Sequence, residues 1–257
     1  KASPLPQLTV KLLFKAGSAH DPAGKEGLAA LTASMVAEAG SRSMRIDEIN
    51  KAFFPMPAAF AAQVDKEMTT FTASVHKDNW NRFAEIALPM LTEPGFREDD
   101  FKRLKEAQLN ALREDLRSNN EEELGKERLQ ANIFAGTPYG HPVLGTLSGI
   151  QAIALEDVKA FWKSAYARSN ALVGIGGDAP PEVRSRLSEV LGQLQGESGL
   201  TNPGKIVGRR PQGFEVDIVQ KETRATAISF GLPIEITRSH PDYAALSLAR
   251  TWLGEDR

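Results

Sequence analysis

Cysteine is absent from this sequence of 257 residues. Its absence excludes disulfide bonds, thiolate metal ligands and a cysteine nucleophile. Long apolar runs are missing as well, since none approaches the roughly 18 residues that a membrane span needs. The formal net charge of -2 gives no excess of positive charge for binding nucleic acid. We therefore expect neither a membrane span nor a nucleic-acid partner.

Histidine is scarce, and a phosphate-binding glycine loop is missing. The four histidines are His20, His76, His141 and His240, and no two of them have the HxxxH spacing of a helical metal site. The segment GIGGD, which ends at Asp178, lacks the GxGxxG spacing of nucleotide-binding loops. We interpret the histidines as structural or solvated side chains. His141 lies in the turn-rich segment TPYGHP, where it helps to fix the course of the chain.

The periodicity of apolar residues predicts both strands and helices. Strands are predicted at 8–16, 58–64, 67–76 and 171–175, and helices at 25–39, 47–54, 80–91, 98–117 with a continuation from 121 to 134, 158–166 and 181–194. This order predicts an α+β fold, mainly an antiparallel sheet with helices packed on it. Trp80, Trp162 and Trp252 lie on apolar helical stripes and are predicted to be core residues. The charged stretch 97–128 is interpreted as a solvated helix face.

Composition divides the chain into three parts. Residues 1–195 form a first α+β domain, and residues 196–213 are rich in Gly and Pro and read as a linker. Residues 214–257 then begin a second, similar domain, with strands predicted at 214–219 and 225–230 and a helix at 241–253. About 45 residues are too few to close a core of their own. We therefore expect further chain after Arg257, and also before Lys1, where no Met begins the sequence.

Three segments carry a resemblance to a known family over most of the chain. They are FKAGSAHDPAGKEGLAALTASM, FREDDFKRLKEAQLNALRED and TPYGHPVLGTLSGIQAIALEDVKAFWKSAYARSNALVGIGGD. In this order they resemble the pitrilysin/insulinase family of zinc metallopeptidases, which includes mitochondrial processing peptidase. With its degenerate H-x-x-E-H motif, the chain resembles the small, non-catalytic subunit of bacterial two-subunit peptidases. The resemblance implies a processing-peptidase-like fold for the first domain.

The catalytic motif of that family is H-x-x-E-H on the first helix, with two His ligands to zinc and a Glu as general base. The resemblance places these three positions at Ala30, Ala33 and Ser34. It places the third zinc ligand, a Glu on a later helix, at Ala111. Methyl groups cannot coordinate a metal, and a catalytic zinc site needs three protein ligands. We therefore predict no catalytic residue, no metal and no cofactor in this chain.

The resemblance implies a non-catalytic subunit of a heteromeric zinc metalloendopeptidase. Its partner would be an active subunit of the same family that holds the zinc, and this chain would help to form the substrate chamber and bind peptide. The predicted strand 67–76 is expected to offer an edge to which an extended peptide can add. Such paired peptidases favour a periplasmic or secreted location, and a cytoplasmic one is the alternative.

Two other functions remain open at this stage. One is a structural or scaffold protein that uses the fold without proteolysis. The other is an enzyme with a relocated metal site, for which Glu106, Glu114 and the histidines are the available ligands. Both glutamates lie outside the spacing of the family's third ligand. The substrate cannot be predicted from the sequence.

Overall fold

The computed structural model describes residues 5–116, 120–222 and 226–255. Its sheet contains four antiparallel strands in the order β2-β3-β1-β4. The strands are β1 (Gln7–Phe14), β2 (Ala58–Val64), β3 (Thr69–His76) and β4 (Ala171–Gly177). In the middle of the sheet, Leu12 of β1 lies opposite Phe71 of β3 and Val173 of β4. The predicted antiparallel sheet is confirmed.

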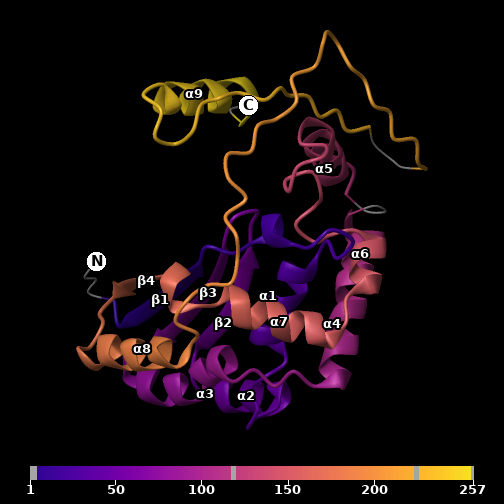
Figure 1. Ribbon diagram of the computed structural model, residues 1–257. Helices are drawn as coiled ribbons and strands as arrows, with labels where there is room; N and C mark the ends of the chain where they lie inside the picture. Colours follow the sequence, from indigo (N-terminus) through magenta and orange to yellow (C-terminus); the bar gives the residue numbers. More distant parts are fainter. Residues whose placement is uncertain (1–4, 117–119, 223–225, 256–257) are drawn as a thin grey trace.

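Helices account for most of the remaining ordered chain (Figure 1). They are α1 (Leu28–Glu38), α2 (Ile46–Phe53), α3 (Trp80–Thr92), α4 (Glu98–Asn110), α5 (Glu121–Ile133), α6 (Leu147–Ala152), α7 (Leu155–Ala165), α8 (Glu182–Gln193) and α9 (Tyr243–Arg250). A π-helical segment, Ala111–Leu116, continues α4, and another, Thr251–Glu255, continues α9. The pause between α4 and α5 was predicted at Asn119 and Asn120. Asn120 directly precedes α5, and residues 117–119 lie outside the described chain.

The core lies between one face of the sheet and the helices packed on it. Every second residue of β1 is buried, from Leu8 to Phe14, and β3 shows the same alternation. Helices α1, α3, α7 and α8 contribute apolar side chains to this same cluster. The ring of Tyr166 lies 4.9 Å from that of Phe14 and 5.2 Å from that of Phe71, measured between centroids. Removal of these apolar faces from water is the main stabilising contribution.

Two of the three tryptophans behave as predicted. Trp80 begins α3 and is only 2% exposed. Trp162 is half-buried against the core, and its Nε1 donates a hydrogen bond to the carbonyl oxygen of Leu91 at 3.0 Å. Trp252 is 78% exposed, so its prediction as a core residue is wrong. A stripe of apolar residues is buried only where a second surface covers it, and no described element covers this one.

The region after α8 is largely irregular. Residues 214–219 form no strand, and neither do the described residues of 225–230, so both strand predictions are wrong for the described chain. A strand requires a neighbour that accepts its backbone hydrogen bonds, and the described residues supply none here. The segment instead runs past α5 (Figure 1), where Asp217 accepts hydrogen bonds from Arg128 and Asn132. The division into two domains and a linker stays a prediction.

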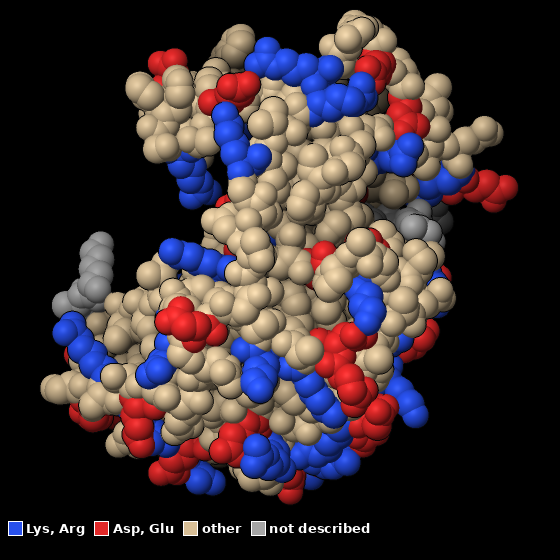
Figure 2. Space-filling view, viewed as in Figure 1, with Lys and Arg blue, Asp and Glu red and all other residues tan. Residues whose placement is uncertain are grey.

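The surface mixes charges of both signs. Figure 2 shows Lys and Arg side chains close to Asp and Glu side chains over most of the face in view. Within the described residues, no helix is both long and apolar enough to cross a membrane.

Candidate functional site

The first turn of α1 is fixed by a side chain from the preceding loop. Gly27 precedes the helix with φ at 107°. The Asp21 carboxylate accepts hydrogen bonds from the backbone N–H groups of Gly27 and Ala29, each at 2.7 Å. Asp21 therefore caps the helix, because the first N–H groups of a helix have no partner within it. Burial raises the pKa of Asp21 to about 7, although the two N–H bonds oppose this rise.

Three of the four family motif positions lie on α1. Ala30 is 8% exposed, Ala33 is 1% exposed and Ser34 is partly buried. Ala33 belongs to the main core cluster. Ala30 and Ser34 are four residues apart and therefore neighbours on the helix surface. The helix retains its place in the core, while these side chains provide two methyl groups and one hydroxyl.

The fourth position, Ala111, follows the last residue of α4 and is partly buried. Helix α4 contacts α1. One turn before Ala111, the amide Nε2 of Gln108 donates hydrogen bonds to the carbonyl oxygens of Gly27 at 3.0 Å and Leu144 at 2.8 Å. The structure therefore packs α1, which holds three of the predicted positions, against α4, directly after which the fourth one lies. That these positions correspond to the family's zinc ligands and base stays a prediction.

Metal ligands do not gather elsewhere in the described chain. Among residues 5–116, 120–222 and 226–255, no group of three His, Asp or Glu side chains is placed to hold a metal ion. Glu106 and Glu114 are exposed, and Glu106 pairs with Arg113 at 3.6 Å. This arrangement offers no support for a relocated metal site in the described residues.

Each histidine takes part in a local loop interaction. The Nδ1 atoms of His20, His76 and His240 lie 3.2–3.3 Å from the backbone N–H groups of Gly17, Asp78 and Asp242 respectively. Nδ1 of His141 lies 2.8 Å from the carbonyl oxygen of Pro142. These contacts agree with the structural interpretation of the histidines.

Three loops meet at the start of α1, and we name them the loop junction: residues 17–21, 65–67 and 139–146. Ser18 and Ala19 donate backbone hydrogen bonds to the carbonyl oxygens of Asp65 and Lys66, at 3.0 and 2.8 Å. Gly17 is required here, because any Cβ would collide with the carbonyl oxygen of Asp65. The loop junction thus connects the capping loop of α1 to the turn between β2 and β3.

Lys66 is the member of the loop junction that sequence reasoning missed. It is buried, and its ammonium donates a hydrogen bond to the carbonyl oxygen of His141. Burial lowers the pKa of Lys66, whereas the carboxylates of Glu127 and Asp21 raise it. Nearby, the hydroxyl of Tyr139 donates a hydrogen bond to Glu67. In the sequence Lys66 reads as an ordinary turn residue, so no local signal indicates that α5 and the 139–146 loop cover it.

The edge strands of the sheet are β2 and β4, and neither is the predicted strand 67–76. Strand β3 pairs with β1 on one side and with β2 on the other, so the predicted peptide-accepting edge at 67–76 is wrong. The strand next to α1 at the edge is β2. None of its seven residues, AAFAAQV, is charged. An uncharged edge strand offers unpaired N–H and C=O groups to an added strand.

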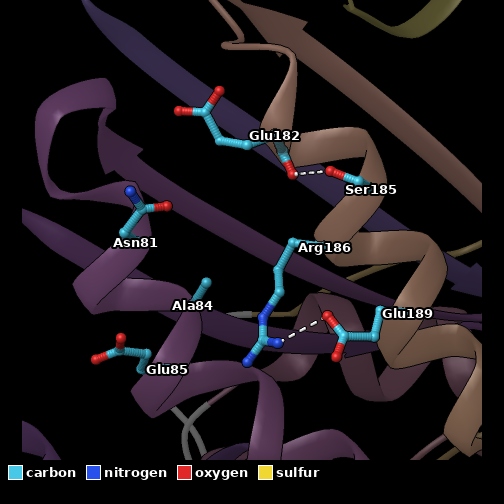
Figure 3. A pocket seen from close by; sticks show the side chains of 7 residues that line it. All are labelled: Asn81, Ala84, Glu85, Glu182, Ser185, Arg186 and Glu189. Atoms are coloured by element: carbon cyan, nitrogen blue, oxygen red, sulfur yellow. Dashed lines mark hydrogen bonds and ion pairs between the residues drawn. The ribbon is translucent and has the colours of Figure 1, made fainter.

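A polar groove with a volume of about 500 Å³ lies between α3 and α8 (Figure 3). Its lining residues are Asn81, Ala84, Glu85, Glu182, Ser185, Arg186 and Glu189. The guanidinium of Arg186 pairs with Glu189 at 2.9 Å, and Ser185 donates to the carbonyl oxygen of Glu182. The one basic side chain of this lining is thus paired with a carboxylate of the same helix, and the groove carries no functional assignment.

Known families match the chain in two consecutive parts. The family model described as Insulinase (Peptidase family M16) matches residues 1–147, and the one described as Peptidase M16 inactive domain matches residues 152–257. The second match begins after the four motif positions.

Individual relatives include proteins named as proteases and a non-peptidase. An uncharacterized zinc protease of Rickettsia bellii is 24% identical over 203 residues, which cover 78% of this chain and 48% of that protein. The non-peptidase homolog YmxG of Helicobacter pylori is 24% identical over 256 residues, covering 97% of this chain and 57% of the relative. This chain thus spans about half the length of the curated relatives it matches.

Among solved structures, the peptidase M16 inactive domain from Pseudomonas fluorescens has a TM-score of 0.79 and 25% sequence identity, covering 98% of this chain and 60% of that one. The two family models together match residues 1–147 and 152–257 of this chain. The chain belongs to the insulinase family, peptidase family M16.

Proposed function

We propose that this chain is a non-catalytic subunit of a heteromeric zinc metallopeptidase. It pairs with an active subunit of the same family, helps to enclose the substrate and binds peptide for that partner. The proposal rests mainly on one observation: α1 is a well-packed helix without metal-binding side chains at the predicted motif positions. The helix is capped, packed and in contact with α4, yet Ala30, Ala33, Ser34 and Ala111 provide no metal ligand or general base.

Peptide binding is assigned to the free edge of β2. This strand lies beside α1, and its uncharged sequence places no charge in the path of an added strand. Backbone hydrogen bonds would hold an extended peptide there with little dependence on its sequence. The chain can therefore contribute to substrate binding, while the partner supplies the zinc and the general base.

Affinity purification from the protein's own cells tests the pairing. We expect a family member with an intact H-x-x-E-H motif to co-purify in near-equal amount. Adding the present chain to that partner should then raise peptide turnover, and peptides N-methylated at alternate amides should not be cleaved efficiently, because they cannot pair with an edge strand. Equal turnover with and without the chain would contradict the proposal. Recovery in a large assembly that contains no peptidase would instead support the scaffold function.

A further inference from the structure

A second, smaller groove lies at the end of the sheet where β2 begins. Its volume is about 390 Å³, and its lining residues are Pro6, Gln7, Pro57, Val75, His76 and Asn79. Pro6 and Pro57 are exposed, whereas Val75 is buried. Asp and Glu, Lys and Arg are absent from this lining. The groove therefore presents apolar surface with neutral polar groups at its rim.

Strand register connects this groove to the free edge. Ala58 pairs with Val75, and His76 pairs with Gln7. Extending the β2–β3 register by one residue places Pro57 beside His76. Pro57 then shares a sheet face with Ala59 and Ala61, because alternate residues of a strand point to the same side. That face is the one opposite the core, since the alternate β2 residues Ala58, Phe60 and Ala62 pack against the core cluster.

The ladder of an added strand would end at this groove. Proline has no N–H to donate, so hydrogen bonding along β2 cannot continue through Pro57. Over the rest of the strand the outward side chains are Ala59, Ala61 and Gln63, and all three are exposed. They form no depression that would favour one peptide side chain over another. The depression at Pro57 is where the edge offers a concave apolar surface.

We propose that this groove binds one large apolar side chain, such as Leu or Phe, of an extended peptide added to β2. The side chain belongs to the peptide residue that lies beside Pro57, and the groove thereby selects uncharged, apolar segments. This inference rests on the proposed peptide-binding function. A charged side chain is disfavoured at that position, because it would lose water without gaining an ionic partner from the lining residues.

Fluorescence anisotropy with short labelled peptides tests the inference. The peptides differ at a single position, which is Leu, Phe, Ala or Asp, and the position is moved along the peptide to find the register. At one register we expect Leu and Phe to bind the 257-residue chain about tenfold more tightly than Asp. Pro57→Asp should abolish that preference, and His76→Glu should weaken it.

Pro211→Asp is the matched control, because it makes the same change at an exposed residue outside both β2 and the groove. It should leave the preference at the groove unchanged. Circular dichroism shows whether each variant folds. If unmodified peptides bind and N-methylated ones do not, but Leu and Asp bind equally at every register, the groove inference is wrong and the strand-addition proposal stands. A preference that survives in folded Pro57→Asp also overturns the inference. If no peptide binds, the peptide-binding part of the proposed function fails first.

Discussion

Residues 5–194 and residues 195–255 contain similar apolar patterns but differ sharply in burial. In the first region β1 and β3 bury alternate side chains in a core that also includes residues of α1, α2, α3, α4, α7 and α8. In the second, large apolar side chains are exposed, among them Phe214, Ile218, Ile228, Phe230, Leu248 and Trp252. Local sequence is thus comparable in the two regions, and the presence or absence of a covering surface decides the outcome.

The largest expected difference between the two regions is in the loss of folding stability when a tryptophan is replaced by alanine. We expect Trp80→Ala to lower the free energy of unfolding by about 3–5 kcal/mol, because it leaves a large cavity in the core. Trp252→Ala should change it by less than about 0.5 kcal/mol, because the side chain is 78% exposed. Urea unfolding followed by circular dichroism measures both. A large loss in Trp252→Ala would show that the second region has a buried surface in solution.

Two aspartates, Asp21 and Asp217, should contribute to the pH dependence of folding stability with opposite signs. The pKa of Asp21 is about 7 in the folded chain, above its unfolded value of about 3.9. The folded state then binds more protons than the unfolded state between these values, so stability falls as pH rises from about 4 to about 7. At about 1.4 kcal/mol for each unit of pKa, this loss is about 2–4 kcal/mol. Urea unfolding at several pH values should show it in the wild type and not in Asp21→Asn.

Asp217 provides the contrasting case in the second region. Hydrogen bonds from Asn132 and Arg128 lower its pKa. Its contribution is therefore present above the unfolded pKa and is lost as pH falls through the lower folded value. Because the group is exposed, the effect should be small. If Asp217→Asn and Asp21→Asn change the dependence of unfolding free energy on pH in the same direction, the predicted contrast between these two aspartates is wrong.

The smallest expected difference is in the stability cost of replacing two glycines, which have the same backbone conformation, by alanine. Gly27 and Gly213 have φ values of 107° and 104°. Alanine at either position incurs the strain of the left-handed region. At Gly27 a Cβ would also lie 2.7 Å from the carbonyl oxygen of Leu144, whereas at Gly213 it would meet no atom within 4 Å. We expect Gly27→Ala to cost about 1–3 kcal/mol more than Gly213→Ala in unfolding experiments.

Much of the first region could be predicted from the sequence because its signals are local. Apolar patterns within single segments predicted all four strands, and the apolar stripe from Trp80 to Leu91 predicted α3. Helix ends were less accurate: α1 begins at Leu28 rather than at 25, since Gly27 and the Asp21 cap set its start. Capping by a residue six positions upstream has no simple sequence signature.

Other features of the candidate site were beyond local reasoning. Strand order made β3 an inner strand and left β2 at the edge, which reversed the predicted peptide-accepting strand. Burial of Lys66 depends on α5 and the 139–146 loop, which are distant in sequence. The groove at Pro57 likewise combines residues from β1, β2 and β3. Each of these three features depends on which segments pack together, and the periodicity of a single segment does not predict that packing.

The sequence by itself determined the alternation and periodicity of the elements and the side chains at Ala30, Ala33, Ser34 and Ala111, since chemical identity does not depend on folding. Tertiary structure decided which strands lie at the edges of the sheet, that Lys66 is buried and which apolar stripes are covered by another element. The physical reason is that hydrogen-bond satisfaction and removal from water are properties of pairs of surfaces. One segment of chain supplies only one surface of each pair.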